Sequence, residues 1–136
     1  DRERRVTSGK STMIDRGEIL LADRASAELS AKARQDLPSA ISTLPLEFVD
    51  ETLSFHPEWI VEKISPRPIL FITTDNDRLV PPEESQSLYN HAKEPKKLVT
   101  LKGHSHYAVY QDPAFSEVMN ETIAWFNQYI PPNYES

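Results

Sequence analysis

The chain has 136 residues, of which 38% are hydrophobic and 26% charged, and this is the composition of one modest globular domain. Its net charge of −6 at pH 7 argues against a surface for nucleic acid or anionic membrane, because both need a basic face, and no apolar run approaches the roughly 20 residues of a membrane span. The absence of cysteine excludes disulfides, thiolate zinc sites and cysteine nucleophiles, and we expect a reducing, cytoplasmic location.

The first half of the chain has weak periodicity. Residues 1–17 are polar and basic, which predicts a loop or a surface arm. The segment 18–37 starts with a short apolar run and predicts an alanine-rich helix, with apolar residues only loosely at helical spacing. The segment 45–64 predicts one or two short helices, and Pro57 is placed to begin the second. Its expected packing residues are Phe48, Leu53 and Phe55.

From Pro66 onward the pattern sharpens. RPILFITT (67–74) and KKLVTLK (96–102) are short apolar runs that predict strands, the first of them buried on both faces. Residues 81–93 predict a helix that starts with prolines and two acids, and residues 112–130 predict a long amphipathic helix. The apolar residues of this last helix are Phe115, Val118, Met119, Ile123, Trp125 and Phe126.

The order strand–loop–helix–strand–loop–helix is typical of a parallel sheet. Both polar loops, 73–80 and 103–110, follow strands, so they should open on the same edge of the sheet, where such folds carry their chemistry. The first loop contributes Asp75 and Asp77, and the second contributes His104 and His106.

An acidic loop beside a histidine loop suggests a carboxylate–imidazole pair. The carboxylate accepts a hydrogen bond from one ring nitrogen and fixes the tautomer, which leaves the other nitrogen as a base. Spacing alone leaves either aspartate as the acid and either histidine as the base. It also leaves open that the aspartates cap the following helix and that the histidines are surface groups.

The stretch SPRPILFITTDNDRLVPPEESQSLYNHAKEPKKLVTLKGHSHYAVYQDP resembles the C-terminal part of α/β-hydrolases, and the resemblance covers Ser65 to about Ile130. In that family an apolar strand is followed by Gly-x-x-Asp, a Val-Pro-Pro-like helix start, a second strand and a histidine loop. The similarity is greatest to acyl-peptidase-like and dienelactone-hydrolase-like esterases and to polyketide or C–C bond hydrolases. The resemblance therefore implies the C-terminal βαβα portion of an α/β-hydrolase sheet, preceded by a helical cap or lid segment.

The resemblance assigns Asp77 to the acid of Gly-x-x-Asp and His106 to the catalytic histidine. Thr74 replaces the usual glycine, and Ser105 replaces the glycine that often precedes the histidine. Asp75 remains an alternative candidate for the acid. His104 is then expected to shape the pocket or to face water.

A family member also needs a nucleophilic serine in Gly-x-Ser-x-Gly and backbone N–H donors for the oxyanion. The chain has only three glycines, at positions 9, 17 and 103, and none of them flanks a serine in that pattern. Since the family order is serine, acid, histidine, we expect the serine upstream of Asp1. The chain should then be the C-terminal half of a serine hydrolase, inactive alone, with residues 1–45 as cap or lid and residues 46–136 as core.

The expected partners are the N-terminal half that carries the serine and a small acyl substrate, with no cofactor and no metal. A zinc site made of His104, His106 and Asp77 has no obvious fourth ligand. TSGKST (7–12) echoes a phosphate-binding loop, but its first glycine is missing and no apolar strand precedes it. The alternative function is a non-catalytic interaction module that kept the scaffold without the serine. A second copy of the chain, in a homo-oligomer, is a further candidate partner.

Overall fold

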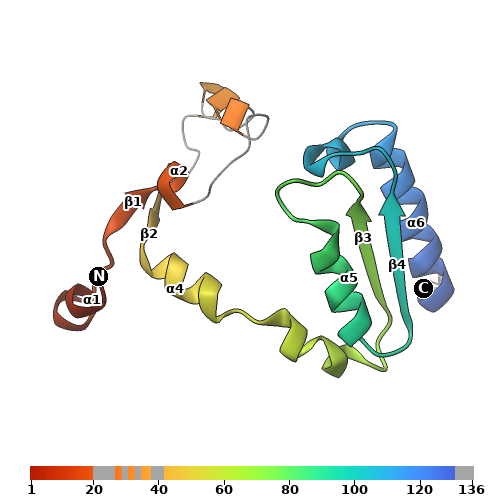
Figure 1. Cartoon of the computed structure of the whole chain (residues 1–136), viewed down its shortest axis with the longest axis horizontal. Coiled ribbons are helices and arrows are strands. Elements are labelled where there is room, and N and C mark those ends of the chain that lie inside the picture. The colour runs from red at the N-terminus through yellow and green to blue at the C-terminus, as the bar shows by residue number, and fades with distance from the viewer. Residues whose placement is uncertain (20–26, 29–30, 33–34, 38–41, 131–136) are drawn as a thin grey trace, which may run out of the picture. The chain divides into compact units, whose positions relative to one another are not determined.

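The computed structural model describes residues 1–19, 27–28, 31–32, 35–37 and 42–130. The chain divides between His56 and Pro57 into two compact units, and each unit is described by itself (Figure 1). The predicted division at residues 45/46, into lid and core, stays a prediction. Most of the helix predicted over residues 18–37 lies outside the described residues.

The first unit contains short elements: α1 (Arg2–Ser8), β1 (Met13–Asp15), α2 (Arg16–Ile19), β2 (Thr43–Pro45) and α4 (Glu47–Ser54). Strands β1 and β2 pair antiparallel, with Ile14 opposite Leu44. The prediction of a loop or arm over residues 1–17 was therefore wrong. The reason is long-range charge pairing, because Arg5 of α1 lies 2.6 Å from Glu47 and 2.5 Å from Asp50 of α4.

The prediction of packing residues in this region was only partly right. Leu53 and Phe55 are 71% and 67% exposed, whereas Phe48 is half-buried. Helix α4 has no buried residue.

The second unit contains the predicted parallel strands. Two 3₁₀ turns, η1 (Pro57–Trp59) and η2 (Val61–Ile64), lead to β3 (Ile69–Thr74), α5 (Pro82–His91), β4 (Lys96–Leu101), η3 (His106–Tyr110) and α6 (Ala114–Tyr129). Strands β3 and β4 pair in parallel from Ile69 opposite Lys96 to Thr74 opposite Leu101. The α/β arrangement is confirmed.

Helices α5 and α6 flank the two strands on opposite sides (Figure 1). At the end of α5, the ammonium group of Lys96 donates hydrogen bonds of 2.7 Å to the carbonyls of Tyr89 and Ala92 and lies 4.4 Å from the centre of the Tyr89 ring. The edge of that ring meets Phe71 of β3 at a centroid distance of 6.3 Å. The ammonium group of Lys96 thus caps the C-terminus of α5 and links this helix to β4.

Burial within this unit is uneven. Thr74 and Leu101, at the carboxyl ends of the strands, are 2% and 4% exposed, and Ala114 at the start of α6 is 1% exposed. The rest of the two strands is half-buried or, at Thr100, exposed, not fully buried as predicted for the first strand. Helix α6 lies where predicted, but part of its apolar set is on the surface, because a two-stranded sheet is too narrow to cover it. These exposed residues are Phe115, Met119, Ile123 and Phe126.

Candidate active site

The structure brings Asp77 and His106 together at the carboxyl ends of β3 and β4, where both polar loops lie (Figure 1). Nδ1 of His106 lies 2.7 Å from Oδ2 of Asp77. The other carboxylate oxygen of Asp77 accepts hydrogen bonds of 2.9 Å from the N–H groups of Leu79 and Val80. The Asp77 side chain is 8% exposed and the His106 side chain 35%. The carboxylate is therefore buried, while solvent reaches the imidazole.

The charge on Asp77 is stabilised in place. Burial raises the pKa of its carboxyl group, but the hydrogen bonds from Val80, His106 and Leu79 outweigh burial and hold that pKa below its usual value. The group is thus ionised at neutral pH. An ionised partner favours a proton on Nδ1 of His106, which leaves Nε2 free to accept a proton.

The second aspartate has a different partner. Oδ1 of Asp75 accepts a hydrogen bond of 2.7 Å from the N–H of Gly103, and its Oδ2 lies 3.8 Å from the ammonium group of Lys102. The hydrogen bond from Nδ1 of His106 goes to Asp77 instead. The two aspartates of the first loop therefore both reach the second loop, at different points.

The two histidines of the second loop also diverge. Nε2 of His104 lies 3.5 Å from Oε1 of Glu117 on α6, and its side chain is 17% exposed, so it faces that helix rather than open water. Ser105 precedes η3 in an extended conformation. The ring of Tyr107 meets the His106 ring edge-on at 4.9 Å between centroids, and this contact limits how the imidazole can tilt.

Sequence reasoning missed the groups that hold these side chains in place. They are the backbone amides of Leu79 and Val80, the amide of Gly103 and the carboxylate of Glu117. The first two had a local signal, since an aspartate two or three residues before an amide readily accepts its hydrogen bond in a turn. The contact to Gly103 had none, because it spans 28 residues.

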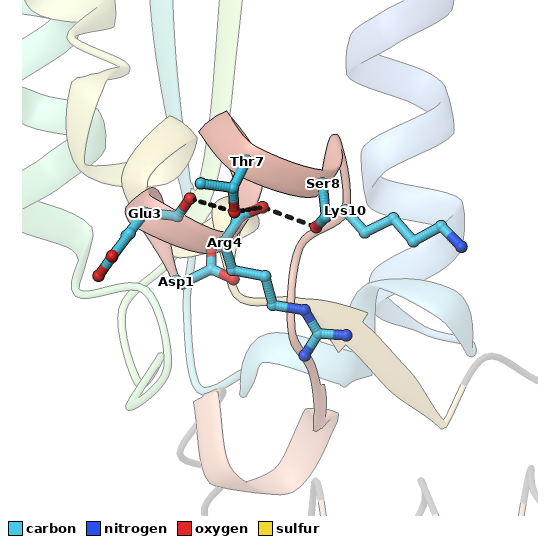
Figure 2. A pocket seen from close by; sticks show the side chains of 6 residues that line it. All are labelled: Asp1, Glu3, Arg4, Thr7, Ser8 and Lys10. Atoms are coloured by element: carbon cyan, nitrogen blue, oxygen red, sulfur yellow. Dashed lines mark hydrogen bonds between the residues drawn. The ribbon is translucent and has the colours of Figure 1, made fainter.

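The segment resembling a phosphate loop is engaged otherwise. Figure 2 shows the open, polar hollow along α1, where the hydroxyls of Thr7 and Ser8 donate hydrogen bonds back to helix carbonyls at 2.9 and 2.7 Å. The N–H of Thr12 donates to the carboxylate of Asp1 at 2.6 Å. An amide that an anion would need is thus paired with a carboxylate, as expected for a surface segment.

In the described part of the chain, no group of three or more histidine and acidic side chains is arranged to hold a metal ion. His104 and His106 turn to different carboxylates, Glu117 and Asp77. Among the same residues, no helix has the length and apolar character needed to cross a membrane.

Sequence comparison finds distant relatives, and no family model matches the chain. An uncharacterised 31.7 kDa protein of the traX–finO intergenic region of Escherichia coli is 26% identical over 129 residues, or 94% of this chain and 44% of its own length. YfhR of Escherichia coli K12 is 34% identical over 59 residues, 43% of this chain and 21% of its own length. The polyketide transferase grgF of a Penicillium species is 38% identical over 56 residues, 41% of this chain and 19% of its own length.

Solved structures give the fold. The α/β-hydrolase GrgF of Penicillium sp. sh18 matches with a TM-score of 0.70 and 22% identity, DcsB with 0.75 and 17%, and a monoacylglycerol lipase of Paleococcus ferrophilus with 0.62 and 18%. These matches cover 93–94% of this chain but only 45–49% of those chains. The chain therefore has the fold of part of an α/β-hydrolase. The proteins that match nearly all of this chain are more than twice as long as the part of them that it covers.

Proposed function

We propose that the chain is the C-terminal half of a serine hydrolase, in which Asp77 and His106 are two members of a Ser-His-Asp triad. The observation that carries the proposal is the 2.7 Å contact between Nδ1 of His106 and the buried carboxylate of Asp77. It leaves Nε2 as the free ring nitrogen, on a side chain that is one-third exposed. A base in this position needs only a nucleophile and an oxyanion site beside it.

The nucleophile and the oxyanion site come from a second segment that carries Gly-x-Ser-x-Gly. Two observations support this partner. The chain spans 45–49% of the solved structures it resembles, and among the described residues the parallel sheet has only two strands, with exposed apolar residues on the α6 helix that packs against it. Within the same proposal, residues 1–45 belong to a cap or lid, the protein is cytoplasmic, and the chain without its partner is inactive.

The reaction is hydrolysis of an ester, a thioester or a related acyl bond in a small substrate. Nε2 of His106 takes the proton of the serine hydroxyl as that oxygen attacks the acyl carbon, and it then gives the proton to the leaving group. Asp77 stays ionised and stabilises the imidazolium that forms between these steps. In the second half of the cycle, His106 removes a proton from water as the water oxygen attacks the acyl carbon, and it returns a proton to the serine oxygen as the serine–acyl bond breaks and the acid product leaves.

Support for an acyl substrate comes from the names of two similar proteins, a monoacylglycerol lipase and a polyketide transferase. The first of these proteins acts on an acylglycerol and the second on a polyketide, as their names say. Cleavage of a carbon–carbon bond by the same residues is a variant of this chemistry, and substrate assays distinguish the two.

The test compares two histidine variants of the complete enzyme, the chain together with its nucleophile-bearing half. His106→Ala should lower kcat/KM for p-nitrophenyl esters of short acids by several orders of magnitude, because it removes the base. His104→Ala is the matched control two residues away, and it should retain most activity. Equal activity of wild type and His106→Ala would contradict the proposal, whereas no activity in either protein would favour a non-catalytic interaction module.

A further inference from the structure

Asp75 joins the two loops of the site at a point separate from the Asp77–His106 pair. Its carboxylate accepts the hydrogen bond of the Gly103 N–H at 2.7 Å. Its own N–H donates to the carbonyl of Leu101 at 3.1 Å, and the next amide, of Asn76, donates to the carbonyl of His104 at 3.3 Å. We call these three contacts the Asp75 clasp. They fasten the acid loop to the start of the histidine loop.

The clasp acts where the histidine loop leaves the sheet. Gly103 has a φ of 76°, the left-handed region in which glycine is favoured, so the chain turns sharply directly after β4. Three residues of chain span at most about 11 Å, so fixing Gly103 restricts where His106 can lie. The carboxylate of Asp75 is the only side-chain acceptor that the described residues provide for the Gly103 amide.

We infer that Asp75 is a positioning residue, which holds the histidine loop so that His106 meets Asp77. The inference rests on the proposed function. Its physical basis is that a displacement of about 1 Å between reacting groups costs on the order of a hundredfold in rate. Asp75 acts through an oxygen acceptor rather than through its charge, since Lys102, the cation that pairs with it among the described residues, is 80% exposed and 3.8 Å away.

The test uses Asp75→Ala, Asp75→Asn and Lys102→Ala in the complete enzyme. Asp75→Ala removes the acceptor and should lower kcat about 10- to 100-fold while KM stays within about threefold. Asp75→Asn restores a carbonyl oxygen for the Gly103 amide and should return kcat to within about threefold of wild type. Lys102→Ala removes the weak ion pair only and should leave kcat unchanged.

A second readout reports the geometry without catalysis. A proton on Nδ1 of His106, held by a short hydrogen bond to the Asp77 carboxylate, should give a proton NMR signal far downfield of the amides. We expect this signal to weaken or broaden in Asp75→Ala and to recover in Asp75→Asn. A purely structural role for Asp75 would lower stability without separating these two variants.

The outcomes distinguish the two proposals. If the signal is present and His106→Ala is inactive, but Asp75→Ala keeps both the signal and the wild-type kcat, the inference about Asp75 is overturned and the proposed function stands. If His106→Ala is fully active, both fail. If Asp75→Ala does not fold, Asp75→Asn decides alone, and a loss of kcat above about tenfold would show that the charge matters and would overturn the inference.

Discussion

The substitution Asp77→Asn tests the site with the smallest change in shape. The Asp77 carboxylate accepts three hydrogen bonds, two from the N–H groups of Leu79 and Val80 and one from His106. An asparagine oxygen can keep both backbone bonds. Its amide group then faces Nδ1 of His106 as a donor, and this reverses the tautomer so that the proton moves to Nε2. The base is lost while the loop keeps its anchor.

The expected loss in kcat is about 10⁴-fold, the magnitude that the same substitution causes in a Ser-His-Asp triad, or roughly 5 kcal/mol of transition-state stabilisation. The free energy of unfolding should fall by about 1–3 kcal/mol, because three charge-assisted hydrogen bonds are replaced by neutral ones. The assay is hydrolysis of a p-nitrophenyl ester by the complete enzyme, with urea unfolding of the same samples. Asp75→Asn is the matched control in the same loop. A loss below tenfold in Asp77→Asn would refute the tautomer argument and move the acid role elsewhere.

Three further predictions concern stability, and urea unfolding measures each of them. Gly103→Ala should lower the free energy of unfolding by about 1–2 kcal/mol. The cost comes from the backbone, because φ is 76°, and not from a clash, because an added Cβ would meet no atom within 4 Å; no change in stability would mean that the turn can relax. Thr74→Val should leave stability unchanged or raise it by up to about 1 kcal/mol, because the buried hydroxyl has no hydrogen-bond partner among the described residues; a loss above 1 kcal/mol would reveal one. Folding lowers the pKa of Asp77, so the ionised carboxylate contributes fully to the free energy of unfolding above the unfolded pKa of about 3.9, and this contribution is lost as pH falls through the lower folded pKa. Asp77→Asn should therefore lose less stability than wild type on acidification, and equal losses would contradict the pKa shift.

The second unit was largely predictable because its signals are local. The runs ILFITT and KKLVTL contain apolar and β-branched residues at strand length, and Pro82 with the following acids marks the start of α5. The parallel pairing followed from the order of the elements, and it placed Asp77 and His106 on the same edge of the sheet. Which of the two aspartates reaches His106 could not be decided from spacing, because both lie in one short turn.

The first unit was less predictable because its contacts are distant in sequence. Helix α1 is tied to α4 by Arg5 and Asp50, which are 45 residues apart, and the pattern of residues 1–17 carries no trace of that pairing. Exposure was also misjudged. Leu53 and Phe55 were expected to pack because they are apolar, but burial depends on neighbouring elements, and the described residues of that unit supply few.

The central claim is that this chain supplies the base while another segment supplies the nucleophile. The most direct measurement is labelling of the complete protein with a fluorophosphonate probe, followed by mass-spectrometric mapping of the modified residue in wild type and His106→Ala. The account predicts one labelled serine, in a Gly-x-Ser-x-Gly sequence outside residues 1–136, and almost no labelling in His106→Ala. A label on a serine of this chain, such as Ser105, or equal labelling of both proteins, would contradict it.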